Sequence, residues 1–247
     1  MKRVQAVEWQ AFLLELTGTT NYFLLCDPDG KTPRGTYDAS SLLSDIRVDS
    51  GSQVTSTTLS FVNSTSRISS TSVIFDGLDT GDFITVSGTV NEANAGTHKI
   101  SSVVDNQTIV VTTTLVTESS TAACKVRQNV KGSTGLSLDA SSNSATGTIL
   151  KGDYLAIYDG TSLTANNPIQ LVMATENATL NTQGGSAADH YSVAIQPKLR
   201  QDLTNNYRVG YASTHNKSRF RLTGNSVEWG ASNLSLYGLS LDAVEVL

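Results

Sequence analysis

The chain has 247 residues, of which 38% are hydrophobic and only 16% charged, and its formal net charge is −5. This balance excludes an intrinsically disordered protein, and it argues against a nucleic-acid reader with a basic face. No apolar run approaches the roughly 20 residues that cross a bilayer, and the polar, interrupted N-terminus does not resemble a signal peptide, so we expect synthesis and folding in a cytoplasm.

Residues 2–17 predict an α-helix with two apolar stripes. At about 100° per residue, Val4, Val7, Ala11 and Leu14 share one side of this helix, whereas Trp9, Phe12, Leu13 and Leu16 share the opposite side. Glu8 and Glu15 lie along one seam between the stripes. A surface helix needs only one apolar face, so this helix is expected to be covered on both sides. Either it is sandwiched inside its own domain, or one stripe packs on a neighbouring subunit.

A helix stop, a strand and a turn follow. Gly18 comes just after the last periodic residue, where a left-handed glycine commonly ends a helix. The apolar run 21–26 predicts a strand buried on both faces, because it lacks alternation. Asp27-Pro28-Asp29-Gly30 is turn chemistry, and it lacks the further oxygen ligands of a calcium loop.

The stretch 37–130 predicts a small β-module. Its first part is rich in Ser and Thr, and from Val73 onward strands are expected at 83–87, 98–104 and 108–113, with 124–130 leading out of the module. Three or four short strands joined by tight turns are typical of a barrel or sandwich.

From Lys131 to the C-terminus further strands are expected, among them one after the Gly-Asp turn at 152–153, one at 169–175, one at 219–222 and a last one at 234–246. Apart from the N-terminal helix no other helix is predicted. The fold class is therefore mainly β, a sandwich or barrel with one N-terminal α-helix and a smaller inserted β-module.

The usual signatures of catalysis and cofactor binding are absent, so we expect no enzyme, no cofactor and no metal site. His98, His190 and His215 lie in separate segments, and a metal trio assembled by the fold stays an open alternative. Asp189 and His190 are adjacent and would point to opposite faces of a strand, and Asp76 and Asp79 fit a turn better than a glycosidase pair. The distant Cys26 and Cys124 do not define a disulfide by sequence alone.

Seven short motifs in fixed order resemble the distal tail proteins of long-tailed (siphovirus-like) bacteriophages. They cover residues 4–36 and 131–247, and they are the helix WQAFL at 9–13 with Gly18, the strand FLL at 23–25, Asp27-Pro28 with Pro33-Arg34-Gly35, KGDY at 151–154, QPKLR at 196–200, FRL at 220–222 with Trp229, and YGLS at 237–240 with Ala243-Val244-Glu245.

Two departures from the family pattern bear on this resemblance. Members usually have several strands ahead of the helix, so those strands are supplied elsewhere or the true start lies upstream. Residues 37–130 have no counterpart in short members. The expected domains are therefore a ring-forming, tail-tube-like β domain at 1–36 and 131–247, and an inserted β-module at 37–130.

The resemblance implies a structural virion protein of the tail tip, a hexameric ring that joins the tail tube to the hub and fibre apparatus. Its expected partners are further copies of itself, the tail tube protein, the hub and fibre proteins and the tape-measure protein. DNA would only pass through the lumen, where an acidic chain suits passage, and no membrane is involved. Location would be the virion, after assembly in the bacterial cytoplasm.

Ring closure needs two different contact surfaces on each subunit, which the two-striped helix fits. We therefore expect subunit contacts at seven helix residues: Val4, Val7, Trp9, Phe12, Leu13, Leu14 and Leu16. Two alternatives stay open: a non-enzymatic module in which 37–130 binds host glycan or a tail fibre, and a hydrolase in which Asp189 or His190 would be required for turnover.

Overall fold

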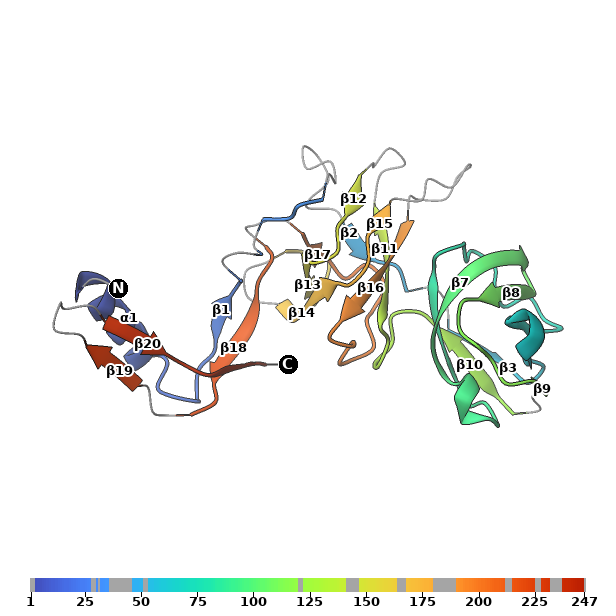
Figure 1. Cartoon of the computed structure of the whole chain (residues 1–247), viewed down its shortest axis with the longest axis horizontal. Coiled ribbons are helices and arrows are strands. Elements are labelled where there is room, and N and C mark those ends of the chain that lie inside the picture. The colour runs from blue at the N-terminus through green and yellow to red at the C-terminus, as the bar shows by residue number, and fades with distance from the viewer. Residues whose placement is uncertain are drawn as a thin grey trace.

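The computed structural model describes residues 3–27, 30, 32–35, 46–50, 53–119, 122–140, 147–163, 168–179, 190–211, 215–224, 228–231 and 237–246. The fold is mainly β with one α-helix, which confirms the predicted fold class. Three parts follow one another along the longest axis (Figure 1): a terminal lobe with α1, a central sheet, and a barrel.

The central sheet has six antiparallel strands in the order β17-β13-β14-β16-β11-β2. Its core is one cluster of buried aliphatic side chains, including Leu136, Leu155 and Val193, each 0% exposed. The strands are β2 (Ile46–Val48), β11 (Gly135–Ala140), β13 (Tyr154–Tyr158), β14 (Pro168–Ala174), β16 (His190–Gln196) and β17 (Val209–Gly210), and β12 (Thr148–Ile149) pairs with β15 (Ala178–Thr179) beside them.

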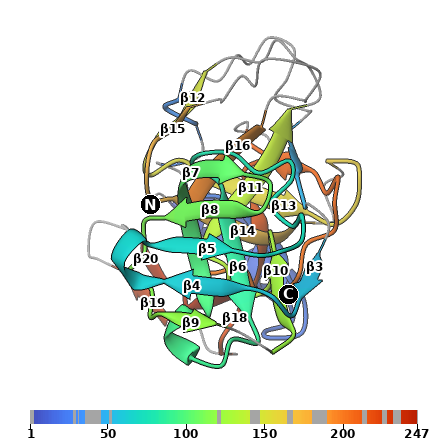
Figure 2. The ribbon, with the colours of Figure 1, turned by 90° about the vertical axis from the view of Figure 1, so that its right-hand side faces the viewer.

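The barrel is a curled, eight-stranded antiparallel sheet in the order β3-β10-β6-β7-β8-β5-β4-β9 (Figure 2). Its core is a second, separate cluster of buried apolar side chains. Its elements are β3 (Val54–Ser56), β4 (Ser60–Val62), β5 (Arg67–Ser69), β6 (Phe83–Ser87), β7 (Gly96–Asp105), β8 (Thr108–Val111), β9 (Glu118–Ser119) and β10 (Cys124–Arg127), with short 3₁₀ turns η1 (Asn63–Thr65) and η2 (Glu92–Asn94).

Several contacts among the described residues hold the barrel against the central sheet. Lys99 Nζ lies 2.5 Å from Glu176 Oε2, and the Ser192 hydroxyl donates to Asp82 Oδ1 at 2.7 Å. Gly135 of β11 lies so close to Phe83 of β6 that a Cβ built on the glycine would overlap the phenyl side chain. The barrel therefore meets the sheet through packed and hydrogen-bonded side chains.

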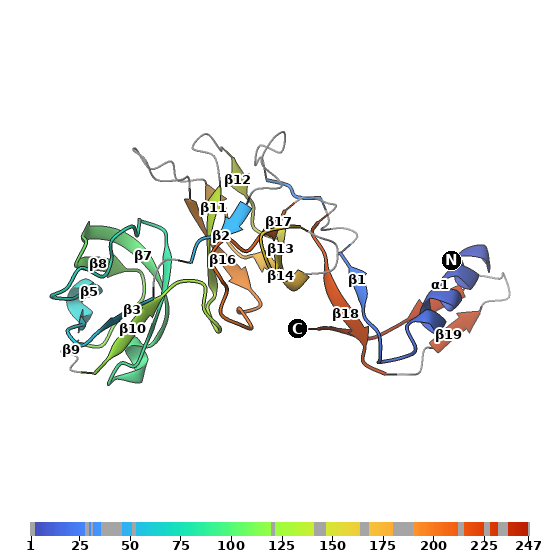
Figure 3. The same ribbon diagram turned by 180° about the vertical axis from the view of Figure 1, so that it is seen from behind.

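The terminal lobe projects from the other side of the central sheet (Figure 3). A three-stranded ribbon in the order β1-β18-β21 leads outward to α1 and to the β19–β20 hairpin. The elements are α1 (Arg3–Glu15), β1 (Phe23–Leu25), β18 (Ser218–Leu222), β19 (Glu228–Ala231), β20 (Tyr237–Ser240) and β21 (Ala243–Glu245).

Four features differ from the sequence expectation. Ile46–Val48, inside the stretch 37–130, pairs with β11 of the central sheet, where Ile46 and Val48 are 0% and 1% exposed in the core. The strands of the barrel therefore lie within residues 54–127. Residues 124–127 are a barrel strand, paired on both sides, and do not merely lead out of it. The run 23–25 is not buried on both faces, since Leu25 is 38% exposed. The expected last strand 234–246 contains two strands, β20 and β21, in different sheets.

The elongated shape exposes much surface. The solvent-accessible area is 12488 Å² for a chain of 26.2 kDa, whereas a compact monomer of that mass exposes about 10,600 Å².

Candidate functional site

Helix α1 forms within the predicted range but ends at Glu15, three residues before the predicted stop at Gly18. Residues 3–15 contain no Gly or Pro and are rich in good helix formers. Thr17 and Gly18 adopt left-handed φ values of 48° and 69°, and the Asn21 amide donates to the Leu16 carbonyl at 3.2 Å. The Asn21 side chain also bonds the Glu15 carbonyl at 3.3 Å. The chain therefore turns sharply from the helix into β1.

The inner face of α1 packs on the ribbon through a chain of aromatic rings. Trp9 contacts Phe12 edge to face at 5.6 Å between centroids, Phe12 contacts Phe23 in the same way at 5.6 Å, and Phe23 lies 6.4 Å from Phe220. Leu16 is buried in the same region. These contacts fix the helix to one face of the β1–β18 pair.

The outer face of α1 is uncovered. Val7 is 56% exposed and Leu14 is 79% exposed, and Ala11 between them is also exposed. We call Val7, Ala11 and Leu14 the outer stripe. Glu8 and Glu15, both exposed, run beside it.

The seven predicted contact residues thus separate into two groups. Trp9, Phe12, Leu13 and Leu16 face the ribbon side, where Phe12 and Leu13 are half-buried, and a hollow of about 270 Å³ beside Glu8 and Phe12 leaves Trp9 41% exposed. Val7 and Leu14 face outward, and the Val4 side chain lies outside the described residues. The subunit-contact role of these seven residues stays a prediction.

The ribbon has a second face that α1 does not cover. Strand alternation places Tyr22, Leu24, Arg219, Arg221 and Val244 on this face, opposite Phe23 and Phe220. The Arg219 guanidinium lies 5.4 Å from the Tyr22 ring, which confirms that they share a side. Tyr22, Arg221 and Val244 are exposed. We call these five residues the open face. Sequence reasoning did not mark it, although the alternation at 219–222 was visible.

A buried carboxylate ties the segment after β1 to the central sheet. Asp153, 2% exposed, accepts from the Arg34 amide at 2.9 Å, the Gly35 amide at 3.1 Å, its own turn's Leu150 amide at 2.9 Å and the Tyr211 hydroxyl at 2.6 Å. The Arg34 guanidinium also bonds the Lys151 carbonyl. The Pro-Arg-Gly and Gly-Asp motifs therefore meet in space, and their sequence separation hid the contact.

These donors keep Asp153 ionised. Burial alone would raise the pKa of its carboxyl, but the hydrogen bonds from Tyr211 and from the Arg34, Leu150 and Gly35 amides outweigh it and leave the pKa below the usual value. Burial, together with the bond to Asp153, raises the pKa of Tyr211, so its hydroxyl stays a donor.

The ribbon is anchored a second time at its C-terminal strand. Glu245, with a side chain only 7% exposed, pairs with Arg200 at 2.7 Å and accepts from the Leu171 amide at 2.5 Å. On the other face, Arg219 Nε donates to the Pro168 carbonyl at 3.0 Å. Both contacts reach β14, so the base of the ribbon is fixed to the central sheet.

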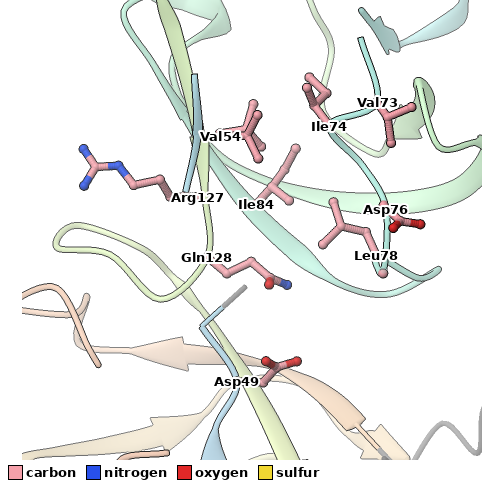
Figure 4. A pocket seen from close by; sticks show the side chains of 11 residues that line it. Asp49, Val54, Val73, Ile74, Asp76, Leu78, Ile84, Arg127 and Gln128 are labelled. Atoms are coloured by element: carbon pink, nitrogen blue, oxygen red, sulfur yellow. The ribbon is translucent and has the colours of Figure 1, made fainter. Parts of the chain in front are cut away.

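A cavity of about 360 Å³ lies where the barrel meets the central sheet (Figure 4). Val54, Ile74 and Ile84 supply apolar walls, and Gln128 and Asp49 close the side toward the sheet. The Arg127 side chain extends away from the other labelled residues and bonds Asp202 at 3.2 Å. The cavity lining is therefore mixed, with polar and apolar side chains both in contact with its space.

The candidate chemical residues do not assemble. Across the described part of the chain, no three His, Cys, Asp or Glu side chains come together in a way that could hold a metal ion. His98 is buried in the barrel, His215 precedes β18, the His190 side chain lies outside the described residues, and so does Asp189. Asp76 lies in a turn, as predicted, and Cys26 and Cys124 are both free thiols. Of the helices the structure describes, none has the length and apolarity to span a bilayer.

Comparisons of this chain with protein-family models, with curated proteins and with solved structures found no significant match. The likeness to distal tail proteins therefore rests on the seven motifs of the sequence alone.

Proposed function

We propose that this chain is a structural subunit of a phage tail tip, a ring-shaped adaptor that joins the tail tube to the hub and fibre proteins without catalysing a reaction. The observation that carries the proposal is the outer stripe. Val7 and Leu14 stand exposed on a helix whose opposite side is already packed on its own ribbon. A contiguous row of exposed apolar side chains is more typical of an interaction site than of a surface that stays in contact with water.

The architecture supports the same function. A projecting lobe anchored at its base by Asp153 and Glu245 can reach a neighbouring subunit without moving relative to its own central sheet. The two anchors use the Pro-Arg-Gly, Gly-Asp and C-terminal motifs on which the resemblance depends. Those motifs thus have one physical task, holding the projecting lobe.

The test is the mass of the full chain in solution. Size-exclusion chromatography with light scattering should give a particle of about six subunits, or roughly 157 kDa as six times 26.2 kDa, alone or after addition of the tail tube and hub proteins. A chain that stays strictly monomeric in all of these mixtures would contradict the adaptor function.

A second function is favoured by the cavity between the barrel and the central sheet: a non-enzymatic module that binds host glycan or a tail fibre. The barrel lies at the end of the molecule opposite the terminal lobe (Figure 1). Val73 lines the cavity and Val104 does not, and both are 53% exposed.

These two valines give a matched pair for a glycan array with the full chain. If the cavity binds a glycan, Val73→Arg should remove the signal and Val104→Arg should keep it. An array that is silent for the unaltered chain would leave the barrel without this role.

A further inference from the structure

We infer that the outer stripe of α1 docks on the open face of the ribbon in a second copy of this chain. The inference rests on the proposed function in one respect, namely that copies of the chain assemble with one another. It goes further by naming the two surfaces that meet.

The outer stripe offers apolar side chains with negative charge beside them. Val7, Ala11 and Leu14 lie one helical turn apart along α1, and Glu8 and Glu15 flank them on one side. The two carboxylates are exposed and about two turns apart, so they form a row parallel to the stripe.

The open face offers apolar side chains with positive charge beside them. Tyr22, Leu24 and Val244 supply the apolar part, with Tyr22 49% and Val244 44% exposed. Arg219 and Arg221 point to the same side of β18, as does Lys217 just before them. This face therefore complements the outer stripe in both charge and polarity.

The contact must join two copies. Within one chain, α1 already packs on the opposite face of the ribbon through Phe12 and Phe23, so its outer stripe points away from its own open face. Two outer stripes would bring Glu8 and Glu15 against the same carboxylates, and two open faces would bring arginines together. Pairing unlike surfaces removes both repulsions and makes a head-to-tail contact, the kind that closes rings.

The size of the contact sets its strength. A helix of 13 residues is about 20 Å long, so one face covers roughly 200 Å², well under the ~800 Å² that each partner gives to a standard interface. The contact alone is too small to hold a ring together, so other contacts between subunits must add to it. Association of the isolated chain should accordingly be weak and should fall as salt screens the charges.

Charge reversal tests the contact directly. Glu8→Lys/Glu15→Lys changes the helix, and Lys217→Glu/Arg221→Glu changes the ribbon; none of these four side chains belongs to either anchor. Sedimentation velocity over a concentration series at low salt should show that each pair weakens self-association about tenfold. Mixing the two double variants should recover association to within about threefold, because reversed surfaces again complement one another.

Matched controls separate this contact from general charge effects. Asp76→Lys/Glu92→Lys matches the charge change of the helix reversal, and Arg67→Glu/Lys125→Glu matches that of the ribbon reversal. All four residues are exposed in the barrel, and each pair should leave association within about twofold of the unaltered chain. Leu14→Asp, at a position 79% exposed, should weaken association at least as much as the helix reversal without loss of folding.

The outcomes distinguish the two proposals. An unaltered chain that forms oligomers unaffected by all three changes would overturn the docking contact and leave the adaptor function standing. An unaltered chain that remains monomeric at every concentration and in the presence of tail proteins would overturn both.

Discussion

Asp153 shows how one buried side chain can set the position of a distant segment. Its two oxygens accept from amides at 34, 35 and 150 and from the Tyr211 hydroxyl, so chain parts more than 110 residues apart converge on one carboxylate. Gly35 allows this approach, because a Cβ there would overlap the Thr148 carbonyl and the Tyr211 hydroxyl. A charged acceptor surrounded by donors stabilises strongly and tolerates little change.

Asp153→Asn tests this role. The amide keeps one acceptor oxygen but turns an NH₂ group toward a backbone donor, so at least one buried amide loses its partner, at a cost of about 3 kcal/mol in the free energy of unfolding. Urea denaturation measures the loss. Asp76→Asn, at an exposed carboxylate in a turn, is the control and should change stability by less than about 0.5 kcal/mol. Equal effects at both positions would contradict the role of Asp153 as an anchor.

At the scale of elements, the placement of the barrel depends on the crossing of β11 and β6. Gly135 has no Cβ, and this absence lets the Phe83 ring lie directly against the strand. Lys99 Nζ then sits 5.5 Å from the centroid of the same ring and pairs with Glu176 across the boundary. Both close packing and an ion pair therefore hold the barrel against the central sheet.

Gly135→Ala should separate the barrel from the central sheet. The added methyl group has no room, and overpacking of this kind costs about 1–3 kcal/mol. Chemical denaturation measures that loss, and small-angle X-ray scattering should show an increased radius of gyration. In the control Gly81→Ala, at φ 101° with open space around it, the strained backbone should cost roughly 1 kcal/mol while the scattering stays unchanged. An unchanged scattering curve for Gly135→Ala would show that the packing of Phe83 on Gly135 does not position the barrel.

Elements with a local signal could be predicted, and pairings between distant strands could not. The helix follows from a 3.6-residue period, and the left-handed turn after it is indicated by Gly18; both signals lie within 17 neighbouring residues. In contrast, Ile46–Val48 is three residues in a polar stretch, and only its burial against β11, some 90 residues away, assigns it to the central sheet. Sequence alone likewise could not assign β10 to the barrel, because that assignment depends on its pairing with both β3 and β6.

The candidate site was predictable in part for the same reason. Periodicity predicted two stripes on α1 but could not tell which stripe stays uncovered, because that depends on Phe23 and Phe220 from two strands nearly 200 residues apart. The Gly-Asp and Pro-Arg-Gly motifs were visible as short words in the sequence. Their meeting at Asp153 requires the fold, since nothing local relates Arg34 to Asp153.

At the scale of the whole molecule, the barrel and the central sheet have separate apolar cores. Each core can therefore respond to solution conditions in its own way, although contacts such as Lys99 with Glu176 join the two parts. The barrel contains a pH-sensitive group in its interior. His98 is 2% exposed, its Nε2 lies 3.0 Å from the Asn94 carbonyl, and its Nδ1 is buried without a hydrogen-bond partner among the described residues.

Acid should destabilise the barrel before the central sheet. Burial lowers the pKa of His98, so the unfolded chain binds a proton that the folded barrel rejects as the pH falls below the ordinary value of 6.5. The barrel is thus most stable above pH 6.5 and loses up to about 1.4 kcal/mol per pH unit below it, until the lowered pKa is reached. Calorimetry at pH 7.5 and 5.5 should show the barrel transition moving to lower temperature while the second transition moves less.

A control variant isolates the effect of His98, because burial and Lys217 also lower the pKa of His215. His98→Gln keeps a donor for the Asn94 carbonyl but does not titrate, so it should remove most of the shift of the barrel transition. A barrel transition that moves equally with and without His98 would refute this account of acid sensitivity.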